Sequence, residues 1–466
     1  MQLPAIIHTI SDVLVSQKAK AIIVGGSVRD HFLNLPIKDY DIEVYGLESL
    51  EVLRDILATY GTVNLVGKHF GVLKFSYEDE VYDFSFPRTE TKVAKGHGGF
   101  DVITDGSLCF EDAAKRRDFT INAMGYDVQN KVFLDPFGGK VDLDAKCLRH
   151  IDDKTFVEDP LRVYRAVQFA GRFDFEVSPK TALLCKQMVE QDTLSELPKE
   201  RIFEEFKKLL LKAKKPSIGF ELMREWGVLL KYFPELQNII GIPQSPKWHP
   251  EGDVWVHTMM CVDEMAHICR LDNTITSTQQ KLKFLFAILC HDLGKAIATT
   301  VDKNGRIRAI GHEYKGIEPT KSLMYRLSNE HDFIASLLPL VEHHLKPSQF
   351  YAAKSKDAAI RRLATKVNIE ELVLLAKADF LGRSTPEALT KKYYAGQWLL
   401  DKAKALNVNK NPPKPLIQGR DLIALGYKPS PKFKKILDEI YTLQLEGKIN
   451  SKEEALTYIR IVDKNK

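Results

Sequence analysis

The pattern of hydrophobic and polar positions changes near residue 145. Before it, short runs rich in β-branched and aromatic residues alternate with turn residues; these runs are AIIVGG, IEVYG, GVLKFSY, VYDFSF and KVFLDPF. After it, nearly every segment repeats its apolar residues at helical spacing. The pattern predicts an α/β head followed by a helical body.

Two proline-containing stretches interrupt the helical pattern. They are GIPQSPKWHPEGD, residues 241–253, and NVNKNPPKPLIQGRD, residues 407–421. Proline and glycine at this density break helices, so both stretches are predicted to be linkers between separate bodies. A chain of 466 residues with 44% hydrophobic residues is also long enough for several cores.

Charge and cysteine content narrow the possible functions only a little. The 67 Lys and Arg residues exceed the 62 Asp and Glu residues, and a net charge of +5 permits a polyanionic partner without requiring one. The six cysteines form no CxxC pair, which argues against a disulfide framework or a zinc cage. The most apolar windows are too short to cross a bilayer. We expect a cytoplasmic protein with no membrane partner.

The first chemical pattern is a pair of aspartates in the segment KDYDIEVYG. Residues two apart on a strand share a face, so Asp39, Asp41 and Glu43 would line one side of a strand. Carboxylates this close repel one another unless they share a cation, and their hard oxygen atoms suit magnesium. The alternative is a solvated strand end.

A glycine pair precedes these acids. The Gly25–Gly26 turn would present backbone amides at a helix N-terminus, where a triphosphate can bind, and Arg29 would add a guanidinium on the first turn. A tight turn without a ligand is the alternative interpretation. Together with the acids, the turn indicates a site for a nucleotide and a metal.

Two further segments extend this site. In VYDFSFPR, Asp83 falls on the face opposite three aromatic residues, which makes it a candidate third carboxylate or a lone surface residue. In KRRDFTINAMGYD, the charged and amide groups suit a ribose and a triphosphate, unless Asp118 only caps a basic helix. The candidates in this segment are Arg117, Asp118 and Asn122.

These segments, in this order, resemble the motifs of class II tRNA nucleotidyltransferases that add or repair the 3′ CCA end, within the polymerase beta-like superfamily. GGSVRD with KDYDIEVYG resembles the metal motif, RRDFTINAMGYD the ribose-sensing motif and DPFGG the hinge motif. EDPLRVYRAVQF resembles the base-selecting motif and LPKERIFEEFKKLLL the helical neck. The resemblance covers about residues 20–210. It implies Glu where this chain has Asp83.

The resemblance implies a fold and a domain order. The head, residues 1–145, would be a small mixed antiparallel sheet with helices. All-α regions would follow as a neck and body with the base-selecting motif over 146–240, a second catalytic domain over 245–395, and a helical tRNA-binding tail over 410–466.

The resemblance also implies a reaction. Magnesium ions held by Asp39 and Asp41, with Asp83 as a further ligand, would activate the 3′-hydroxyl of tRNA for attack on the α-phosphate of CTP or ATP. Arg29, Arg117 and Arg165 would offset phosphate charge. The segment 89–112, rich in Gly and Lys, would be a mobile loop used in switching from C to A.

The base-selecting motif has a chemical rationale. Asp159, Arg162 and Arg165 are spaced three apart, which would place them on one face of a helix, and Gln168 continues the row. Cytosine and adenine both present an amino donor beside a ring-nitrogen acceptor, which a carboxylate beside a guanidinium matches. The alternative is an intrahelical salt bridge between Asp159 and Arg162 on a solvent-exposed surface.

The second half contains a different set of potential metal ligands, which resembles the HD phosphohydrolase family over about residues 250–390. The segments are VWVHTMM, FAILCHDLGK, AIGHEYKG, LVEHHLKP, which holds both His343 and His344, and LLAKADFLGR. The predicted ligands are His257, His291, Asp292, His312, His343 and Asp379. Such ligands suit a divalent transition metal such as Ni²⁺, or Mg²⁺, and imply phosphatase or 2′,3′-cyclic phosphodiesterase activity.

Three hypotheses follow for the whole chain. The leading one is a CCA-adding enzyme that uses tRNA, CTP, ATP and Mg²⁺, with an appended phosphohydrolase. A bacterial poly(A) polymerase would share the chemistry, and an inactive RNA-binding homologue would keep only the scaffold. The tail segment, residues 417–459, carries Lys and Arg residues that would contact phosphate or form a solvated face.

Overall fold

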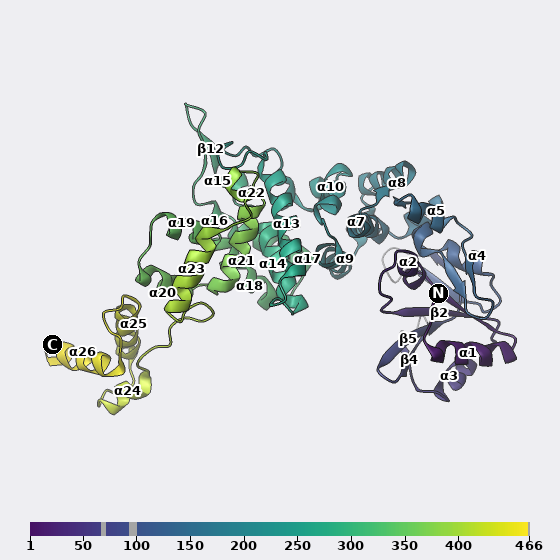
Figure 1. Cartoon of the computed structure of the whole chain (residues 1–466), viewed down its shortest axis with the longest axis horizontal. Coiled ribbons are helices and arrows are strands. Elements are labelled where there is room, and N and C mark those ends of the chain that lie inside the picture. Colours follow the sequence, from purple (N-terminus) through teal and green to yellow (C-terminus); the bar gives the residue numbers. More distant parts are fainter. Residues whose placement is uncertain (67–70, 93–99, 465–466) are drawn as a thin grey trace. The chain divides into compact units, whose positions relative to one another are not determined.

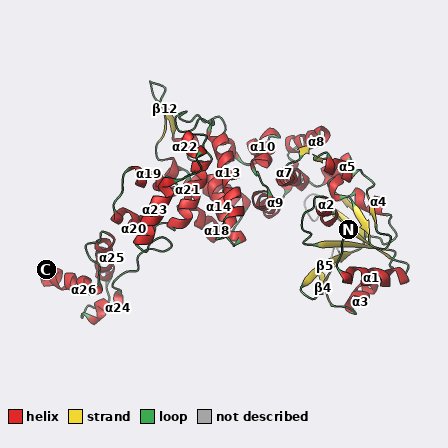
Figure 2. Cartoon of the chain, viewed as in Figure 1, coloured by secondary structure: helices red, strands yellow, loops and turns green. Residues whose placement is uncertain are grey.

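The computed structural model describes residues 1–66, 71–92 and 100–464. It divides into two compact units, Met1–Tyr232 and Phe233–Lys466, which are described separately. Strands are concentrated in the first unit, whereas the second is almost entirely helical (Figure 2). The predicted α/β head and helical body are confirmed.

The head of the first unit contains a seven-stranded mixed sheet. Its order is β3-β4-β5-β2-β1-β8-β9; β2 and β5 pair in parallel, and the other neighbours pair antiparallel. The strands are β1 (Lys20–Val24), β2 (Tyr40–Tyr45), β3 (Thr62–Val66), β4 (Val72–Tyr77), β5 (Glu80–Ser85), β8 (Gly125–Asp127) and β9 (Val132–Leu134). Strand β1 is an apolar run after Lys20 because both of its faces are covered, whereas β2 carries the acids Asp41 and Glu43 between its apolar residues.

Short helices and a hairpin complete the head. The helices are α1 (Ala5–Ser16), α2 (Gly26–Phe32), α3 (Leu50–Ala58), α4 (Phe110–Lys115) and α5 (Gly139–Asp144), with a 3₁₀ turn at Thr120–Asn122. The strands of the sheet lie among α1 to α4 (Figure 1). The hairpin pairs β6 (Arg88–Lys92) with β7 (Phe100–Thr104). Both strands belong to the segment predicted to be a mobile loop, and residues 93–99 of that segment lie outside the described residues.

The helices that follow the head pack closely on one another. They are α6 (Asp153–Glu158), α7 (Leu161–Phe173), α8 (Pro179–Glu190), α9 (Lys199–Lys212), α10 (Ser217–Glu225) and α11 (Val228–Tyr232). A small parallel pair, β10 (Cys147–Leu148) with β11 (Glu176–Val177), flanks α7. Tyr164 of α7 and Phe206 of α9 bring their rings to 6.4 Å, so an aromatic core holds the base-selecting motif in place.

The second unit begins with a bundle of helices. They are α12 (Pro234–Gln237), α13 (Val254–Leu271), α14 (Thr278–Cys290), α15 (Lys295–Ala298), α16 (His312–Lys315), α17 (Ile317–Leu327), α18 (His331–His343), α19 (Lys346–Ala352), α20 (Asp357–Ala364), α21 (Ile369–Leu381), α22 (Pro386–Leu389) and α23 (Tyr394–Ala405). Residues 284–290 of α14 are all buried, as expected of a central helix. A hairpin, β12 (Thr299–Val301) with β13 (Ile307–Ala309), follows α15.

The chain ends in three helices, α24 (Gly419–Ala424), α25 (Pro431–Leu445) and α26 (Lys452–Lys464). They share a small apolar core that includes Leu422, Ile440 and Ala455. Among the described residues, no helix combines the length and the apolar character needed to cross a bilayer.

Candidate functional site

Two of the predicted head carboxylates lie on neighbouring strands. The parallel register of β2 and β5 places Asp41 directly opposite Asp83, so both side chains project from one face of the sheet. Asp39 is exposed and precedes β2, which begins at Tyr40. The Ser27 hydroxyl donates to the Asp39 backbone oxygen at 2.8 Å, which ties this segment to the first turn of α2.

The charge around Asp41 fits a divalent cation. Desolvation raises the pKa of the Asp41 carboxyl, and Asp83 and Asp39 raise it further, whereas Arg117 opposes the rise. Excess negative charge of this kind is relieved when carboxylates share a hard metal ion. The head acids are spaced more widely than the potential metal ligands of the second unit. Among the described residues, the groups of three or more ligand atoms that all lie within 4.8 Å of one another belong to the second unit.

Glu43 does not join the aspartates. It is 2% exposed and accepts hydrogen bonds from Arg116 and Arg117 at 2.9 Å each, and from the Tyr45 hydroxyl at 2.8 Å. Burial alone would raise the pKa of the Glu43 carboxyl, but the two guanidinium groups lower it. The sequence pattern placed Glu43 on this face without revealing that it positions two arginines.

Arg117 lies against the glycine turn, as a phosphate-binding residue there would. The backbone at Gly25 has φ 69° and ψ −125°, a conformation that favours glycine. A Cβ at Gly25 would come within 2.8 Å of Arg117 Nη1. Gly26 is the first residue of α2, so the predicted turn at a helix N-terminus is present.

A chain of hydrogen bonds links the remaining candidates. Arg29 Nη1 donates to Asn122 Oδ1 at 2.5 Å, Asn122 Nδ2 donates to Asp118 Oδ1 at 2.9 Å, and Arg165 Nε donates to Asp118 Oδ2 at 2.6 Å. Burial would raise the pKa of the Asp118 carboxyl, but Arg165 and Asn122 lower it. The ionised Asp118 therefore joins α2, the 3₁₀ turn and α7.

The expectation that Asp159 shares a helical face with Arg162 and Arg165 is wrong. Asp159 has extended backbone angles, φ −112° and ψ 102°, and lies between α6 and α7. The reason is Pro160, since a residue before proline is driven out of the helical region. Asp159 Oδ1 instead accepts from the Leu161 backbone amide at 3.1 Å.

Arg162 and Gln168 lie on α7 itself. Arg162 donates to the backbone oxygens of Thr155 and Arg116 at 2.7 and 2.6 Å. Gln168 is buried, and its Nε2 has no hydrogen-bond partner within the described part of the chain. Arg162 thus links α7 to α6 and to the backbone at Arg116, while Gln168 faces the interior.

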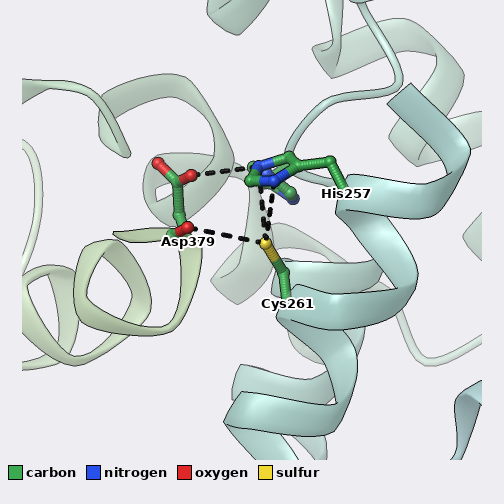
Figure 3. Close-up of side chains that lie close together, drawn as sticks. His257, Cys261 and Asp379 are labelled. Atoms are coloured by element: carbon green, nitrogen blue, oxygen red, sulfur yellow. Dashed lines mark hydrogen bonds and ion pairs between the residues drawn. The ribbon is translucent and has the colours of Figure 1, made fainter. Parts of the chain in front are cut away.

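A second cluster of titratable side chains lies inside the second unit. Asp292 lies two residues after the end of α14, and its carboxylate oxygens lie 3.2 Å from His291 Nε2 and 3.2 Å from His312 Nε2. His257 Nε2 of α13 lies 3.1 Å from Asp379 Oδ1 of α21 (Figure 3). All five predicted ligands named here are buried and converge.

The remaining position is taken by His344 instead of the predicted His343. His344 Nε2 lies 3.3 Å from His312 Nε2, and its Nδ1 donates to the Val341 backbone oxygen at 2.7 Å. Burial and the neighbouring histidines lower the pKa of His344 to about 3, so its ring is neutral. His343 is buried outside the group of potential ligands.

The chemistry of the cluster fits a metal ion. His291 Nε2 and Asp292 Oδ1 are buried, and although each lies 3.2 Å from an oppositely charged partner, neither is aligned for a hydrogen bond within the described residues. Burial alone would lower the pKa of His257, yet Cys261, Asp379 and Glu251 raise it to about 10. The proton on this ring offsets carboxylate charge, and a metal ion would replace it.

The segment predicted as the first linker supports this cluster. Glu251 Oε1 lies 2.8 Å from His257 Nδ1 and 2.9 Å from His249 Nδ1, and it is nearly fully buried. A carboxylate that accepts from Nδ1 leaves Nε2 of the same imidazole free to bind a metal. Residues 241–253 thus belong to the second site, and the linker interpretation is wrong for them.

A pocket of about 240 Å³ opens onto these ligands. Asp292, His312, His344 and Asp379 contribute to its wall. The lining also includes basic and aromatic side chains that sequence reasoning did not assign: Lys295, Arg308, Arg383 and Trp248. Lys295 Nζ lies 2.6 Å from Asp292 Oδ2. Positive charge beside a set of metal ligands suits a phosphate group.

Comparison with known proteins identifies the family of the chain. Residues 21–149 match the poly A polymerase head domain, and residues 174–240 match a probable RNA- and SrmB-binding site of polymerase A. A multifunctional CCA protein of Nitrosospira multiformis is 34% identical over 381 residues, 80% of this chain and 86% of the relative. The chain belongs to the family of CCA-adding enzymes.

Other members agree. A multifunctional CCA protein of Acinetobacter baumannii is 35% identical over 371 residues, 78% of this chain and 84% of the relative. The CCA-adding enzyme of Bacillus stearothermophilus, solved with CTP, shares the fold with a TM-score of 0.67 at 20% identity over the whole of both chains. The resemblance to class II CCA-adding enzymes found in the motifs is confirmed, and this chain is a tRNA nucleotidyltransferase by family.

Proposed function

We propose that this chain adds the terminal C, C and A to tRNA from CTP and ATP and releases pyrophosphate. The observation that carries the proposal is the pairing of Asp41 with Asp83 on adjacent strands, near the Gly25–Gly26 turn. The relatives of this chain are CCA proteins. The structures of CCA-adding enzymes solved with CTP, with ATP and with tRNA support the same assignment.

Asp41 and Asp83, with Asp39, would hold Mg²⁺ in the head. When bound there, the ion would lower the pKa of the attacking hydroxyl and offset phosphate charge. The Gly25–Gly26 turn offers backbone amides to the triphosphate, and Arg117 stands beside it with its charge held in place by Glu43. The buried chain from Arg29 to Asp118 fixes this arrangement before a nucleotide arrives.

Base selection would use groups near the start of α7. Asp159 keeps 23% of its side chain exposed, with Arg201 Nη2 3.5 Å from its second oxygen. A carboxylate acceptor beside a guanidinium donor suits the amino and ring-nitrogen pair of cytosine and adenine. Guanine and uracil would leave these groups unpaired, a difference of about 1–3 kcal/mol for each bidentate contact.

Incorporation of each of the four triphosphates on a tRNA trimmed of its CCA end tests this proposal. We expect growth by C, C and then A, which stops without a chain terminator. Growth with ATP alone would identify a poly(A) polymerase instead. No incorporation, with tRNA still bound, would indicate an RNA-binding homologue without activity.

We also propose that the second unit is an HD-type phosphohydrolase. The convergence of His257, His291, Asp292 and Asp379 beneath a pocket that contains Lys295 supports it. A metal ion there would supply a hydroxide nucleophile at neutral pH, and Ni²⁺ or Mg²⁺ are candidates. The basic side chains would orient a phosphomonoester or a 2′,3′-cyclic phosphate at an RNA end.

Hydrolysis of a 2′,3′-cyclic nucleotide by the metal-loaded protein tests the second activity. We expect turnover that Asp292→Asn abolishes, because Asp292 links His291 to His312. An Asp438→Asn control changes an exposed carboxylate on α25, away from the pocket lining, and should leave turnover unchanged. Equal turnover by Asp292→Asn would contradict the assignment.

A further inference from the structure

A cysteine lies among the candidate metal ligands of the second unit. Cys261 follows His257 by one turn of α13, so the two side chains leave the helix on the same side. Cys261 Sγ lies 3.4 Å from His257 Nε2 (Figure 3). His257, Cys261, His291 and Asp379 each offer one ligand atom, and these atoms all lie within 4.8 Å of one another.

The spacing of these atoms suits one shared ion. In a tetrahedral zinc site with Zn–S near 2.3 Å and Zn–N near 2.0–2.1 Å, adjacent ligand atoms are separated by about 3.4–3.6 Å. The sulfur-to-nitrogen distance of 3.4 Å fits this range, and His257 Nε2 to Asp379 Oδ1 at 3.1 Å needs only a small opening.

The packing of α13 against α21 places Cys261 Sγ beside the other potential ligands. A Cβ at Gly382, just after α21, would lie 2.4 Å from Cys261 Sγ and 2.8 Å from the Cys261 backbone nitrogen. Only glycine allows the two helices to approach this closely. The approach sets Cys261 Sγ 3.7 Å from the Asp379 backbone oxygen and directs it toward the cluster.

The environment of His291 also indicates a cation beside these ligand atoms. His291 is fully buried, and its Nε2 makes no hydrogen bond among the described residues. Its Nδ1 already donates to the Ile288 backbone oxygen at 2.7 Å, so Nε2 presents a lone pair to the cluster. Asp292 Oδ2 lies 3.2 Å from this nitrogen without forming a hydrogen bond, and two buried acceptors that face each other are costly unless a cation lies beside them.

We propose that Cys261 is a thiolate ligand of the metal centre in the second unit, in a mixed set that includes His257, His291 and Asp379. The proposal rests on the metal centre proposed above and adds one ligand to it. On binding, the thiol proton is released to solvent and the sulfur forms a bond to the metal. Thiolate favours zinc and other transition ions over magnesium, so this centre selects a soft or borderline metal.

Cobalt substitution of the full chain tests this ligand directly. Co²⁺ bound by a thiolate gives a sulfur-to-metal charge-transfer absorption in the near ultraviolet, which the oxygen ligands of the head do not give. We expect this absorption in the wild type and its loss in Cys261→Ser and Cys261→Ala. Cys269→Ser is the matched control, because Cys269 is buried on the same helix two turns further along, outside the cluster.

Zinc affinity gives a second readout. We expect Cys261→Ser to bind zinc at least about tenfold more weakly than the wild type, by competition with a chromogenic chelator, while Cys269→Ser stays unchanged. Circular dichroism of the same variants reports whether the helical second unit has folded, and nucleotide addition reports separately on the head. Unchanged zinc affinity and absorption in Cys261→Ser would overturn the proposal.

A His257→Ala variant separates this proposal from the one it rests on. If the wild type binds more cobalt than His257→Ala but shows no charge-transfer absorption, the metal centre stands and the thiolate ligand is refuted. If the two proteins bind the same amount of cobalt and zinc, the metal centre itself is refuted, and the thiolate ligand with it.

Discussion

At the scale of single residues, one buried carboxylate organises the nucleotide site. Asp118 receives hydrogen bonds from Asn122 and Arg165, and Asn122 in turn orients Arg29. A buried charge of this kind is stable only while both partners are present, because removal of one leaves the others desolvated and unpaired. Asp118 therefore contributes to stability as well as to nucleotide binding.

Asp118→Asn should lower the free energy of unfolding of the first unit by about 2–3 kcal/mol at neutral pH. The folded-state pKa of Asp118 lies below its unfolded value, so its stabilisation is present above the unfolded pKa, near 4, and is lost as pH falls through the folded pKa. Urea unfolding across this range should show the gap between wild type and variant closing below about pH 4. A gap that does not change with pH would contradict the assignment.

Gly25 makes the phosphate turn possible in two ways. Its positive φ disfavours other residues, and a Cβ there would meet Arg117 Nη1 at 2.8 Å. We expect Gly25→Ala to destabilise the head by about 1–3 kcal/mol and to raise KM for CTP and ATP, measured by steady-state incorporation. Gly305→Ala is the control, since Gly305 has φ 71° with nothing near its Cβ. Wild-type KM values for Gly25→Ala would argue against the turn as a phosphate site.

The sequence predicts which side chains lie together only where a regular strand or helix period sets their direction. Strand alternation placed Asp83 opposite the aromatic face, and β5 buries Tyr82 and Phe84 as expected. The choice between His343 and His344 depends on which ring turns inward at the end of α18, which adjacent identical residues do not reveal. Glu43 shows the same limit, because its partners, Arg116 and Arg117, are more than seventy residues away.

At the scale of elements, the second site depends on close approaches between short helices. Gly294 lies between Asp292 and α15, and a Cβ there would come within 2.0 Å of the His312 backbone oxygen. This contact holds α16, and with it the His312 ring, against the turn after α14. A side chain at position 294 would have to push α16 away from Asp292.

Gly294→Ala should therefore weaken metal binding in the second unit by about tenfold or more, as loss of ligand positioning does. Its nucleotide addition should stay at the wild-type level. Metal content after dialysis against zinc measures the effect, and Gly305→Ala on the neighbouring hairpin loop again serves as control. Full zinc occupancy in Gly294→Ala would show that α16 does not position a ligand.

The long elements follow from periodicity, and the short ones do not. The five runs of β-forming residues correspond to β1, β2, β4, β5 and β9. The strands β3 and β8 and the β6–β7 hairpin were not predicted. The polar β6 and the three-residue β8 form strands through pairing with neighbours, whereas β3 (TVNLV) and β7 (FDVIT) carry a strand pattern that was overlooked. Residues 241–253 break helical periodicity as a linker would, yet Glu251 packs them against His257.

At the scale of the whole molecule, the two candidate sites are made from different units. The nucleotide site uses residues of Met1–Tyr232, and the metal cluster uses residues of Phe233–Lys466. The motif order predicted this separation, since the nucleotidyltransferase motifs end near residue 210 and the histidines begin near 257. The division into a head, a neck and body, a second domain and a tail, with the boundaries given above, stays a prediction.

Separate sites should give complementary losses. We expect Asp292→Asn to lose hydrolysis of a 2′,3′-cyclic nucleotide by more than about a hundredfold while it retains CCA addition. Asp41→Ala should lose CCA addition and retain hydrolysis. Both activities measured on the same preparations test this. Parallel loss in either variant, with the protein folded by circular dichroism, would show that the sites do not work separately.

The most direct test of the account is single-turnover addition of CTP to trimmed tRNA by wild type, Asp41→Ala and Asp79→Ala. Asp79 is an exposed acid at the β4–β5 turn and serves as the matched control. We predict that Asp41→Ala loses addition by more than about a hundredfold while its affinity for tRNA is unchanged, and that Asp79→Ala matches the wild type. Addition by Asp41→Ala at the wild-type rate would contradict the central claim that the head carboxylates carry nucleotide transfer.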